Sequence, residues 1–434
     1  MELLLHSMGR KLLAVIAAVA ATAGLSLPLW RYFQVERLEA EGSPASLERA
    51  IQLQPEKAAL YNRLGHLLLF SGADDNGRAV ATLEKATALN PHAGAYWVEL
   101  STARELQGDL TGAENAMERA RGVEPNTPSI VWQEMNLALR QAQTERTLRL
   151  ARELLAEAPE YTGRVLTLLA EIAAPPVLVR DILPATLSSL TDGIEIFSRQ
   201  NQMEAAEPLW TRLLALNEPP SAYYVRKLLD AVLDAGNVPL ARRIWSDSIR
   251  RGWIAGDAAA LHEPLYNGDF HYPLLNFGFD WRVIQHPEAS VWIEASGPEP
   301  GQQSLCVEFA EGARAGFAHV THAVPVEPDT FYSLHGFLRT NRLSSRGGAY
   351  LQAVEIQPRP GQTAKTVPVI GTGGWQEVSL RLETGRETRL VQLALVRPAV
   401  PPGDAPATGR VCLAGIEWKA LGQVRASRAP EGAR

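Results

Sequence analysis

The sequence predicts a multidomain chain of two successive fold types, an α-helical repeat array followed by an antiparallel β-sandwich. Three observations support this: prolines recur at a nearly constant spacing in the first half, short alternating stretches replace the helical pattern near residue 264, and one apolar segment precedes both parts. The 434 residues suffice for about three structural units. The predicted segments are 1–31, 32–263, 264–421 and 422–434, the last a disordered tail.

The composition is that of a globular protein, with 46% hydrophobic and 21% charged residues. The 42 basic and 48 acidic residues give a net charge of −6, and no basic block supplies the positive patch that a nucleic-acid binder needs. Two cysteines are too few for a disulfide-built scaffold or a four-thiolate zinc site. We therefore expect no nucleic-acid partner, no metal site and no cofactor.

The first predicted element is a membrane anchor. Residues 12–30 carry no charge and follow Arg10 and Lys11. As a helix they would span about 28 Å at ~1.5 Å per residue, close to the thickness of a bilayer core. This predicts a single-pass signal anchor in the inner membrane, with a short cytoplasmic tail and the bulk of the chain on the periplasmic or extracytoplasmic side. The alternatives are a signal peptide cleaved within 18–23 and a buried helix of a soluble protein.

Helical repeats account for the next segment. Prolines that end helix-like stretches stand at Pro55, Pro91, Pro125 and Pro159, separated by 36, 34 and 34 residues, which is the period of a helical-pair repeat. Small residues such as Ala113 let two antiparallel helices approach each other, while larger apolar residues fill the groove between neighbours. The best unit has its aromatic, small and proline residues at Trp97, Leu100, Ser101, Arg104, Gly108, Ala113, Met117, Ala120 and Pro125.

This unit resembles the tetratricopeptide (TPR) repeat family, and the preceding unit matches the family through Leu64-Gly65. Weaker copies extend the array to about Gly252, with interruptions at 173–176 and 217–220. The resemblance implies an α-solenoid whose concave face docks protein partners. Candidate groove residues are polar positions on the first helices, for which the alternative is an ordinary solvated helix face: Asn62, Arg63, His66, Glu99 and Arg104.

Short alternating stretches, typical of strands, fill most of the chain after residue 264. In one of them Leu305, Val307 and Phe309 share one face while Cys306 lies on the other, so one face is predicted to be buried and the other wet. The number of strands suits a two-sheet sandwich. The predicted strands are 290–295, 304–309, 317–326, 331–339, 350–357, 375–382, 389–396 and 410–418.

Residues 266–270, which read Tyr-Asn-Gly-Asp-Phe, together with Gly374-Trp375 and Trp418, resemble the jelly-roll domains of carbohydrate-binding modules over roughly 266–420. The resemblance implies a sugar ligand, which needs an aromatic plane and convergent polar groups. The family's calcium ligands are replaced here by His271 and by residues without side-chain oxygens, so no calcium is expected. Trp281 and Trp375 are expected in the core, and the candidates for sugar contact are Trp292, Tyr350, His319 and Arg339.

The two cysteines, Cys306 and Cys412, fall in predicted strands, each on the face opposite its apolar neighbours. If the two strands are adjacent, an oxidising compartment would permit a disulfide that closes a long loop. Two separate free thiols are the alternative.

Motifs of catalysis are missing from the sequence. It contains no Gly-rich phosphate loop, zinc-protease His-Glu pair or serine nucleophile elbow, and its carboxylates carry no marker of a glycosidase pair. We therefore predict a non-enzymatic, membrane-anchored envelope scaffold that docks proteins through its repeats and contacts a glycan through its sandwich. By resemblance, this combination suits polysaccharide synthesis or export, including exopolysaccharide. The alternatives are a pure protein-assembly scaffold without a sugar site and a glycan-processing enzyme.

Overall fold

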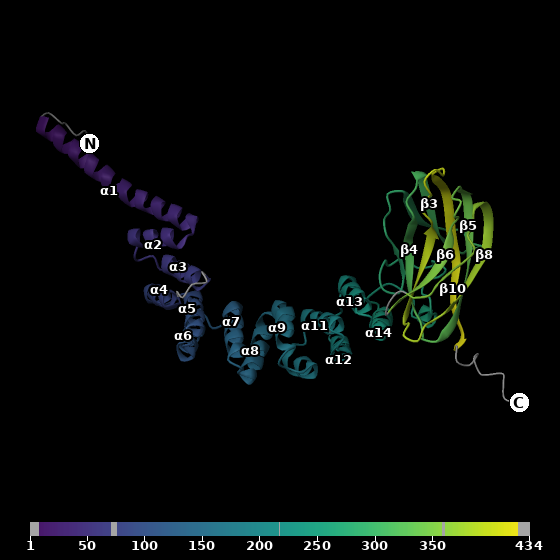
Figure 1. Ribbon diagram of the computed structural model, residues 1–434, viewed down its shortest axis with the longest axis horizontal. Helices are drawn as coiled ribbons and strands as arrows, with labels where there is room; N and C mark the ends of the chain where they lie inside the picture. The colour runs from purple at the N-terminus through teal and green to yellow at the C-terminus, as the bar shows by residue number, and fades with distance from the viewer. Residues whose placement is uncertain (1–7, 71–75, 217, 358–360, 424–434) are drawn as a thin grey trace. The chain divides into compact units, whose positions relative to one another are not determined.

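The computed structural model describes residues 8–70, 76–216, 218–357 and 361–423 (Figure 1). The helices precede the strands, which confirms the predicted order of an α-helical array and an antiparallel β-sandwich. The chain divides into two compact units, Met1–Ala158 and Pro159–Arg434. The predicted segment boundaries stay predictions.

The first unit is built from helix pairs. α3 packs against α4, α5 against α6, and α7 against α8, each pair joined by a short connection (Figure 1). Glycine is required at Gly65, where a Cβ atom would lie 2.5 Å from the Leu83 side chain on the partner helix. The helices are α1 (Met8–Glu41), α2 (Pro44–Leu53), α3 (Ala58–Phe70), α4 (Asn76–Leu89), α5 (Gly94–Leu106), α6 (Leu110–Val123), α7 (Pro128–Arg140) and α8 (Thr144–Glu157).

The prediction of a membrane anchor is wrong. Within the described part of the chain, no helix is both long enough and apolar enough to cross a membrane. α1 continues past the apolar run through a charged stretch to Glu41, and that stretch packs onto the repeats. Val35 is buried in a core shared with α2 and α3, and Glu39 accepts a 2.7 Å hydrogen bond from Lys57. The predictions that depended on the anchor are also wrong: an inner-membrane localisation, a cytoplasmic tail and membrane contact through 12–30.

The second unit begins with further helices. The interruption predicted at 173–176 is present: a three-residue helix there runs directly into a π-helical turn. Regular pairing resumes with α11 and α12 and then α13 and α14. The elements are η1 (Pro159–Tyr161), α9 (Thr162–Leu169), α10 (Pro175–Val177), η2 (Leu178–Ile182), α11 (Leu187–Arg199), α12 (Met203–Leu214), α13 (Ala222–Asp234), α14 (Val238–Arg250) and η3 (Ala259–His262).

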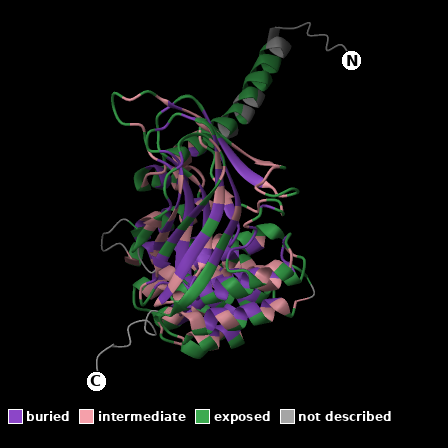
Figure 2. Cartoon of the chain, turned by 90° about the vertical axis from the view of Figure 1, so that its right-hand side faces the viewer, coloured by how far each residue is buried: buried purple, intermediate pink, exposed green. Residues whose placement is uncertain are grey.

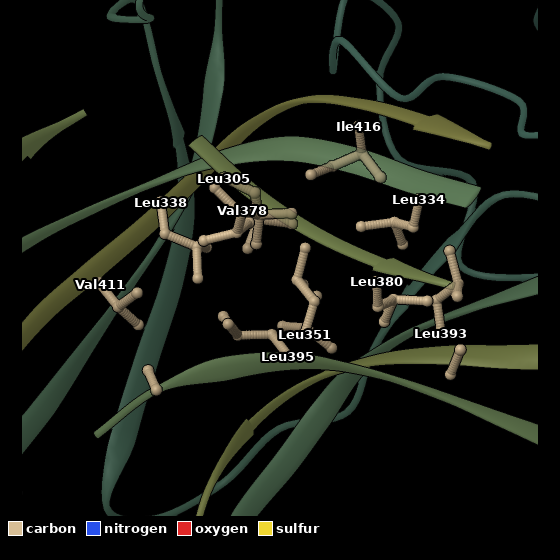
Figure 3. Packing of buried hydrophobic residues seen from close by; sticks show 14 of the residues in the cluster. Leu305, Leu334, Leu338, Leu351, Val378, Leu380, Leu393, Leu395, Val411 and Ile416 are labelled. Carbon is tan, nitrogen blue, oxygen red and sulfur yellow. The ribbon is translucent and has the colours of Figure 1, made fainter. Parts of the chain in front are cut away.

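The described strands of the second unit form two five-stranded antiparallel sheets, in the orders β1-β4-β9-β6-β7 and β2-β3-β10-β5-β8. Leu305 and Leu338 of one sheet meet Leu351 and Leu395 of the other in the core (Figure 3). The strands are β1 (Trp281–Val283), β2 (Ala289–Glu294), β3 (Ser304–Ala313), β4 (Phe317–Pro325), β5 (Thr330–Leu343), β6 (Tyr350–Gln357), β7 (Thr363–Lys365), β8 (Gly371–Glu383), β9 (Leu390–Arg397) and β10 (Ala407–Gln423).

Burial alternates along β8, as the predicted period of two requires, but not along every strand (Figure 2 colours each residue by burial). In β8, Val378, Leu380 and Leu382 are buried, while the residues between them are exposed. The prediction of one wet face is wrong for the first part of β3, where Ser304 and Cys306 are buried as fully as Leu305 and Val307, because the cluster around the disulfide covers the outer face. β10 extends to Gln423 and so includes the first two residues of the predicted tail, 422–434. The rest of that tail lies outside the described residues.

An aromatic contact joins the last helix of the array to the sandwich. Trp245 on α14 is 4% exposed and packs edge-on against Tyr266, Phe277 and Phe279 at ring-centroid distances of 5.4, 6.0 and 6.1 Å. Gly278, at a φ of +62°, passes so close that a Cβ atom would lie 2.7 Å from the Trp245 ring. This helix pair and the sandwich therefore share one interface, which we call the Trp245 joint.

The segment 266–270 anchors the entry to the sandwich through its backbone. The Trp281 indole donates a hydrogen bond of 3.0 Å to the Asn267 carbonyl oxygen, and Nε2 of His322 lies 2.9 Å from the Tyr266 carbonyl oxygen. The Ile416 amide donates to the Gly268 carbonyl oxygen at 2.9 Å. These hydrogen bonds give the segment a structural role at the start of the sandwich.

Burial shifts the pKa values of two groups near this segment in opposite directions. Desolvation raises the carboxyl pKa of the fully buried Asp280 to about 6 and lowers the imidazole pKa of the fully buried His322 to about 4. Because the folded protein keeps His322 neutral, its contribution to the unfolding free energy has its full value above the unfolded pKa of ~6.5. This contribution is lost as the pH falls toward 4. Asp280 has the opposite pH dependence, because the folded protein favours its protonated carboxyl group. Its contribution to the unfolding free energy is complete below pH 3.8 and is lost as the pH rises through 6.

The substitution His322→Gln is expected to remove the first of these pH dependences. Between pH ~6.5 and ~4 the native chain should lose about 3 kcal/mol of unfolding free energy relative to the variant, since one pKa unit corresponds to ~1.4 kcal/mol. Urea denaturation of both proteins across this range measures the difference. Because Asp280 is present in both, its opposite slope cancels. Parallel curves for the two proteins would contradict the neutral, buried state of His322.

Candidate functional site

Polar side chains on the first helices of the repeats meet across neighbouring repeats. Nδ1 of His66 on α3 lies 3.0 Å from both carboxylate oxygens of Glu99 on α5. The guanidinium of Arg140 on α7 donates two hydrogen bonds, of 2.8 and 2.7 Å, to the carboxylate of Glu105 on α5. Asn62 is one turn from His66 on the same side of α3. We call the surface formed by these five residues the repeat face.

One group of the repeat face has no partner. Oδ1 of Asn62 is buried, and no hydrogen bond to it is present among the described residues. A buried carbonyl oxygen of this kind accepts a hydrogen bond in most proteins, so the position favours a donor that arrives with a ligand. Phe70 is 69% exposed, and its ring centroid lies 4.8 Å from that of His66, so it adds an apolar element to the same side of α3.

Of the predicted groove residues, the structure brings Asn62, His66 and Glu99 together and leaves two elsewhere. Arg104 braces the repeat, because its guanidinium donates to the Glu84 carboxylate at 2.9 Å and to the Gly112 carbonyl oxygen at 3.2 Å. Arg63 is exposed and makes no hydrogen bond to the repeat face in the described part of the chain.

Sequence reasoning missed Glu105 and Arg140. Their separation of 35 residues is close to the repeat period, and their charges are opposite. Such a spacing places the two side chains at similar positions of successive first helices, so a search for opposite charges one period apart would have found them.

A second cluster lies on the outer face of the β2-β3-β10-β5-β8 sheet. Cys306 and Cys412 are opposite each other on β3 and β10 and form a disulfide, the first of the two alternatives that the sequence left open. The register continues the row outward, since Trp292 on β2 pairs with Cys306 and Arg339 on β5 pairs with Cys412. Four strands thus contribute one row of side chains across the sheet.

Cations stack on the aromatic rings beside the disulfide. The Arg410 guanidinium lies 4.8 Å from the Trp292 ring centroid, and the Arg339 guanidinium lies 4.8 Å from the Trp375 ring centroid. Glu294 joins the two halves, because its carboxylate accepts from Arg339 at 2.9 Å and from Arg410 at 3.4 Å. We call these five residues the Trp–Arg cluster. Trp375, expected in the core, is instead half-buried on this outer face.

The other two candidates for sugar contact, Tyr350 and His319, lie on the opposite sheet, in β6 and β4. The Lys365 ammonium lies 5.4 Å from the Tyr350 ring centroid. The His319 ring lies 4.5 Å from that of His286, and burial, followed by this second imidazole, lowers the pKa of His319. The structure therefore brings together Trp292 and Arg339 but not all four candidates.

A potential metal-binding group coincides with the disulfide. A carboxylate oxygen of Glu294 and the sulfurs of Cys306 and Cys412 lie within 4.8 Å of one another. Because both sulfurs are joined in the disulfide, neither is a thiolate, which is the form of cysteine that binds metals. We therefore assign no metal to this group, which shares only Glu294 with the Trp–Arg cluster.

No protein-family model and no curated protein matches the chain. Similar solved structures include TTC0263, a thermophilic TPR protein of Thermus thermophilus, at 20% identity over 29% of this chain and 71% of that chain, with a TM-score of 0.27. YrrB, a TPR protein with an unusual peptide-binding site, is 15% identical over 39% and 91% (TM-score 0.27). The enzymatically active domain of bacteriophage CBA120 tailspike protein 4 is 12% identical over 37% and 22% (TM-score 0.28). Similarities this low do not indicate which residues of the chain form a site.

The helix pairs of the described chain themselves fit a TPR repeat protein. Stacked helix pairs of this kind form an extended surface along the array. The chain adds an antiparallel β-sandwich to such an array.

Proposed function

We propose that this protein is a non-enzymatic scaffold whose repeat face binds an extended segment of a partner protein. The observation that supports this most directly is the buried, unpartnered Oδ1 of Asn62, with the exposed ring of Phe70 about two turns farther along the same side of α3. An extended peptide offers both complements, because a backbone N–H supplies the missing donor once the half-buried Asn62 side chain turns outward, and an apolar side chain covers the Phe70 ring. His66 and Glu99 extend the same face toward the next repeat.

To test this proposal, a phage-displayed library of random peptides is selected for binding to the full chain. The affinity of a selected peptide is measured by calorimetry against Asn62→Ala and Phe70→Ala. Each variant should weaken binding about tenfold, the size of one lost hydrogen bond or apolar contact. Neither residue is fully buried, so both variants should fold.

Lys85→Ala is the matched control, since Lys85 is exposed on α4, the second helix of the same repeat. It should leave the peptide affinity unchanged. A library that yields no binder, or a peptide whose affinity depends on Lys85 and not on Asn62 or Phe70, would refute the proposal.

The Trp–Arg cluster supports a second candidate function, contact with a polysaccharide. Trp292 and Trp375 are half-buried, so each ring keeps an accessible part, and the fork-shaped donors of Arg339 and Arg410 lie beside the rings. Aromatic surface with convergent donors is what recognition of a sugar ring requires. The two tryptophans lie on the edge strands β2 and β8, so the cluster extends across the width of the sheet and could contact successive units of a polymer.

Affinity electrophoresis of the full chain in gels that contain dextran or alginate tests sugar contact. Trp292→Ala and Trp375→Ala should abolish retardation, while Tyr223→Ala, which removes an aromatic ring that is 70% exposed on α13, should retain it. If neither polymer retards the native chain, the proposed sugar contact is contradicted and the protein-binding function alone is retained. Circular dichroism of each variant establishes that it is folded.

A further inference from the structure

A cavity of about 220 Å³ lies beside the Trp245 joint, within the second unit. Its walls include three aromatic rings of the joint, those of Trp245, Tyr266 and Phe279, and its rim carries arginines of α14. Arg242, Ser246 and Arg250 follow one another at intervals of four residues and so line one stripe of that helix. From this geometry we propose that the cavity binds a small organic anion, a ring of sugar size that carries a carboxylate or a phosphate.

The arginines at the cavity are available to a ligand. The side chains of Arg242, Arg243 and Arg250 are 57, 45 and 57% exposed. Their nearest carboxylates, on Glu327, Glu207 and Asp247, lie 3.9, 3.5 and 3.6 Å away, beyond the about 2.7–3.2 Å of a good N–H···O hydrogen bond. In the described part of the chain, these three guanidinium groups donate no side-chain hydrogen bond to protein.

The charge of the cavity lining favours an anion. Three guanidinium groups line the cavity with one carboxylate, that of Glu263. The carboxylates of Glu327, Glu207 and Asp247, which form long ion pairs with these arginines, are not lining residues, and a bound anion would replace them as partners. A guanidinium fork matches the paired oxygens of a carboxylate or phosphate and forms the stronger, charge-assisted type of hydrogen bond. Glu263 and Ser246 supply acceptors for the hydroxyl groups of the same ligand, since the Ser246 hydroxyl donates its own hydrogen to the Arg243 carbonyl oxygen at 3.1 Å.

The apolar walls and the volume define the rest of the ligand. Pro264 and Pro325 offer apolar surface for the carbon face of a ring, while the aromatic side chains, which are only 3–4% exposed, close the cavity from inside. The cavity is smaller than the ~300–1,000 Å³ usual for drug-sized ligands, so it takes a compact molecule and not a polymer. This site is separate in sequence and in fold from both the repeat face and the Trp–Arg cluster, and the proposal stands apart from the proposed function.

Calorimetric titration of the full chain with glucuronate, glucose 6-phosphate and neutral glucose tests the proposal. At least one of the two anions should bind saturably, at least about tenfold more tightly than glucose, and more weakly as the salt concentration rises. Binding of glucuronate alone assigns a carboxylate ligand, and binding of glucose 6-phosphate alone assigns a phosphate ligand.

The double variant Arg242→Gln/Arg250→Gln should raise the dissociation constant of the bound anion by at least about tenfold. Arg226→Gln is the matched control, because Arg226 on α13 is 56% exposed and lies 3.7 Å from its carboxylate partner, but does not line the cavity. If circular dichroism shows the double variant unfolded, Arg250→Gln alone replaces it. No binding of either anion at millimolar concentration, equal binding of glucose, or an equal loss in Arg226→Gln would overturn the proposal.

Discussion

Replacing Cys306 and Cys412 together by alanine is expected to produce the largest loss of stability in the sandwich. The disulfide links residues 106 apart in sequence. In the chain-entropy model, a cross-link that closes a loop of this size stabilises the folded state by about 4.7 kcal/mol, because it restricts the unfolded chain. We expect the unfolding free energy of the second unit to fall by about this amount, measured by guanidinium denaturation.

The control is the native chain reduced in denaturant and then assayed with reductant present. It should match the double variant, whereas reductant should leave the double variant unaffected. An unchanged midpoint for the reduced native chain would show that the disulfide contributes nothing to stability. A loss seen in the variant but not in the reduced chain would point to packing of the two side chains rather than to the cross-link.

The second large effect is expected from Trp245→Ala. Truncation of a buried tryptophan costs about 3–5 kcal/mol, because the transfer energy of the ring is lost and a cavity remains. Three aromatic rings lose their partner in this variant. We expect the helices and the sandwich of the second unit to unfold in two separate steps instead of one, seen by calorimetry and by circular dichroism at helix and strand wavelengths.

Tyr223→Ala serves as the control for this variant, because it removes an exposed aromatic side chain from the neighbouring helix α13. Its effect should stay within about 0.5 kcal/mol, as for most surface substitutions. A single cooperative transition with unchanged midpoint in Trp245→Ala would refute the view that the Trp245 joint couples the two folds.

Local periodicity explains why the fold class could be predicted. Leu305, Val307 and Phe309 alternate with polar residues, and this pattern alone places Cys306 on the outer face. Likewise, Gly65 marks a close approach of two helices, and the packing against Leu83 bears out that reading. These signals are local, so they survive in a single sequence.

The contacts that depend on strand order could not be predicted. Arg410 reaches Glu294 across 116 residues of sequence because β10 lies inside the sheet, next to β3. The same order separates His319 and Tyr350 from Trp292 by placing them in the other sheet. Trp245 falls within the weaker repeat copies that precede Gly252, and nothing in its own helix shows which aromatic rings will cover it. The apolar run at 12–30 gave a wrong prediction of a membrane anchor for a related reason. The run itself does not show where the helix that contains it ends.

The covering of the disulfide by its neighbours bears on when it forms. Cys306 and Cys412 are 0 and 1% exposed, beneath the Trp–Arg cluster. Thiol–disulfide exchange requires a thiolate to reach one of the sulfurs, and such an approach is closed once the outer face is in place. The oxidation state is therefore decided while the chain is still folding. A molecule that closes its outer face as a dithiol should keep it until it reopens, so the two redox forms would behave as separate populations with different folding histories.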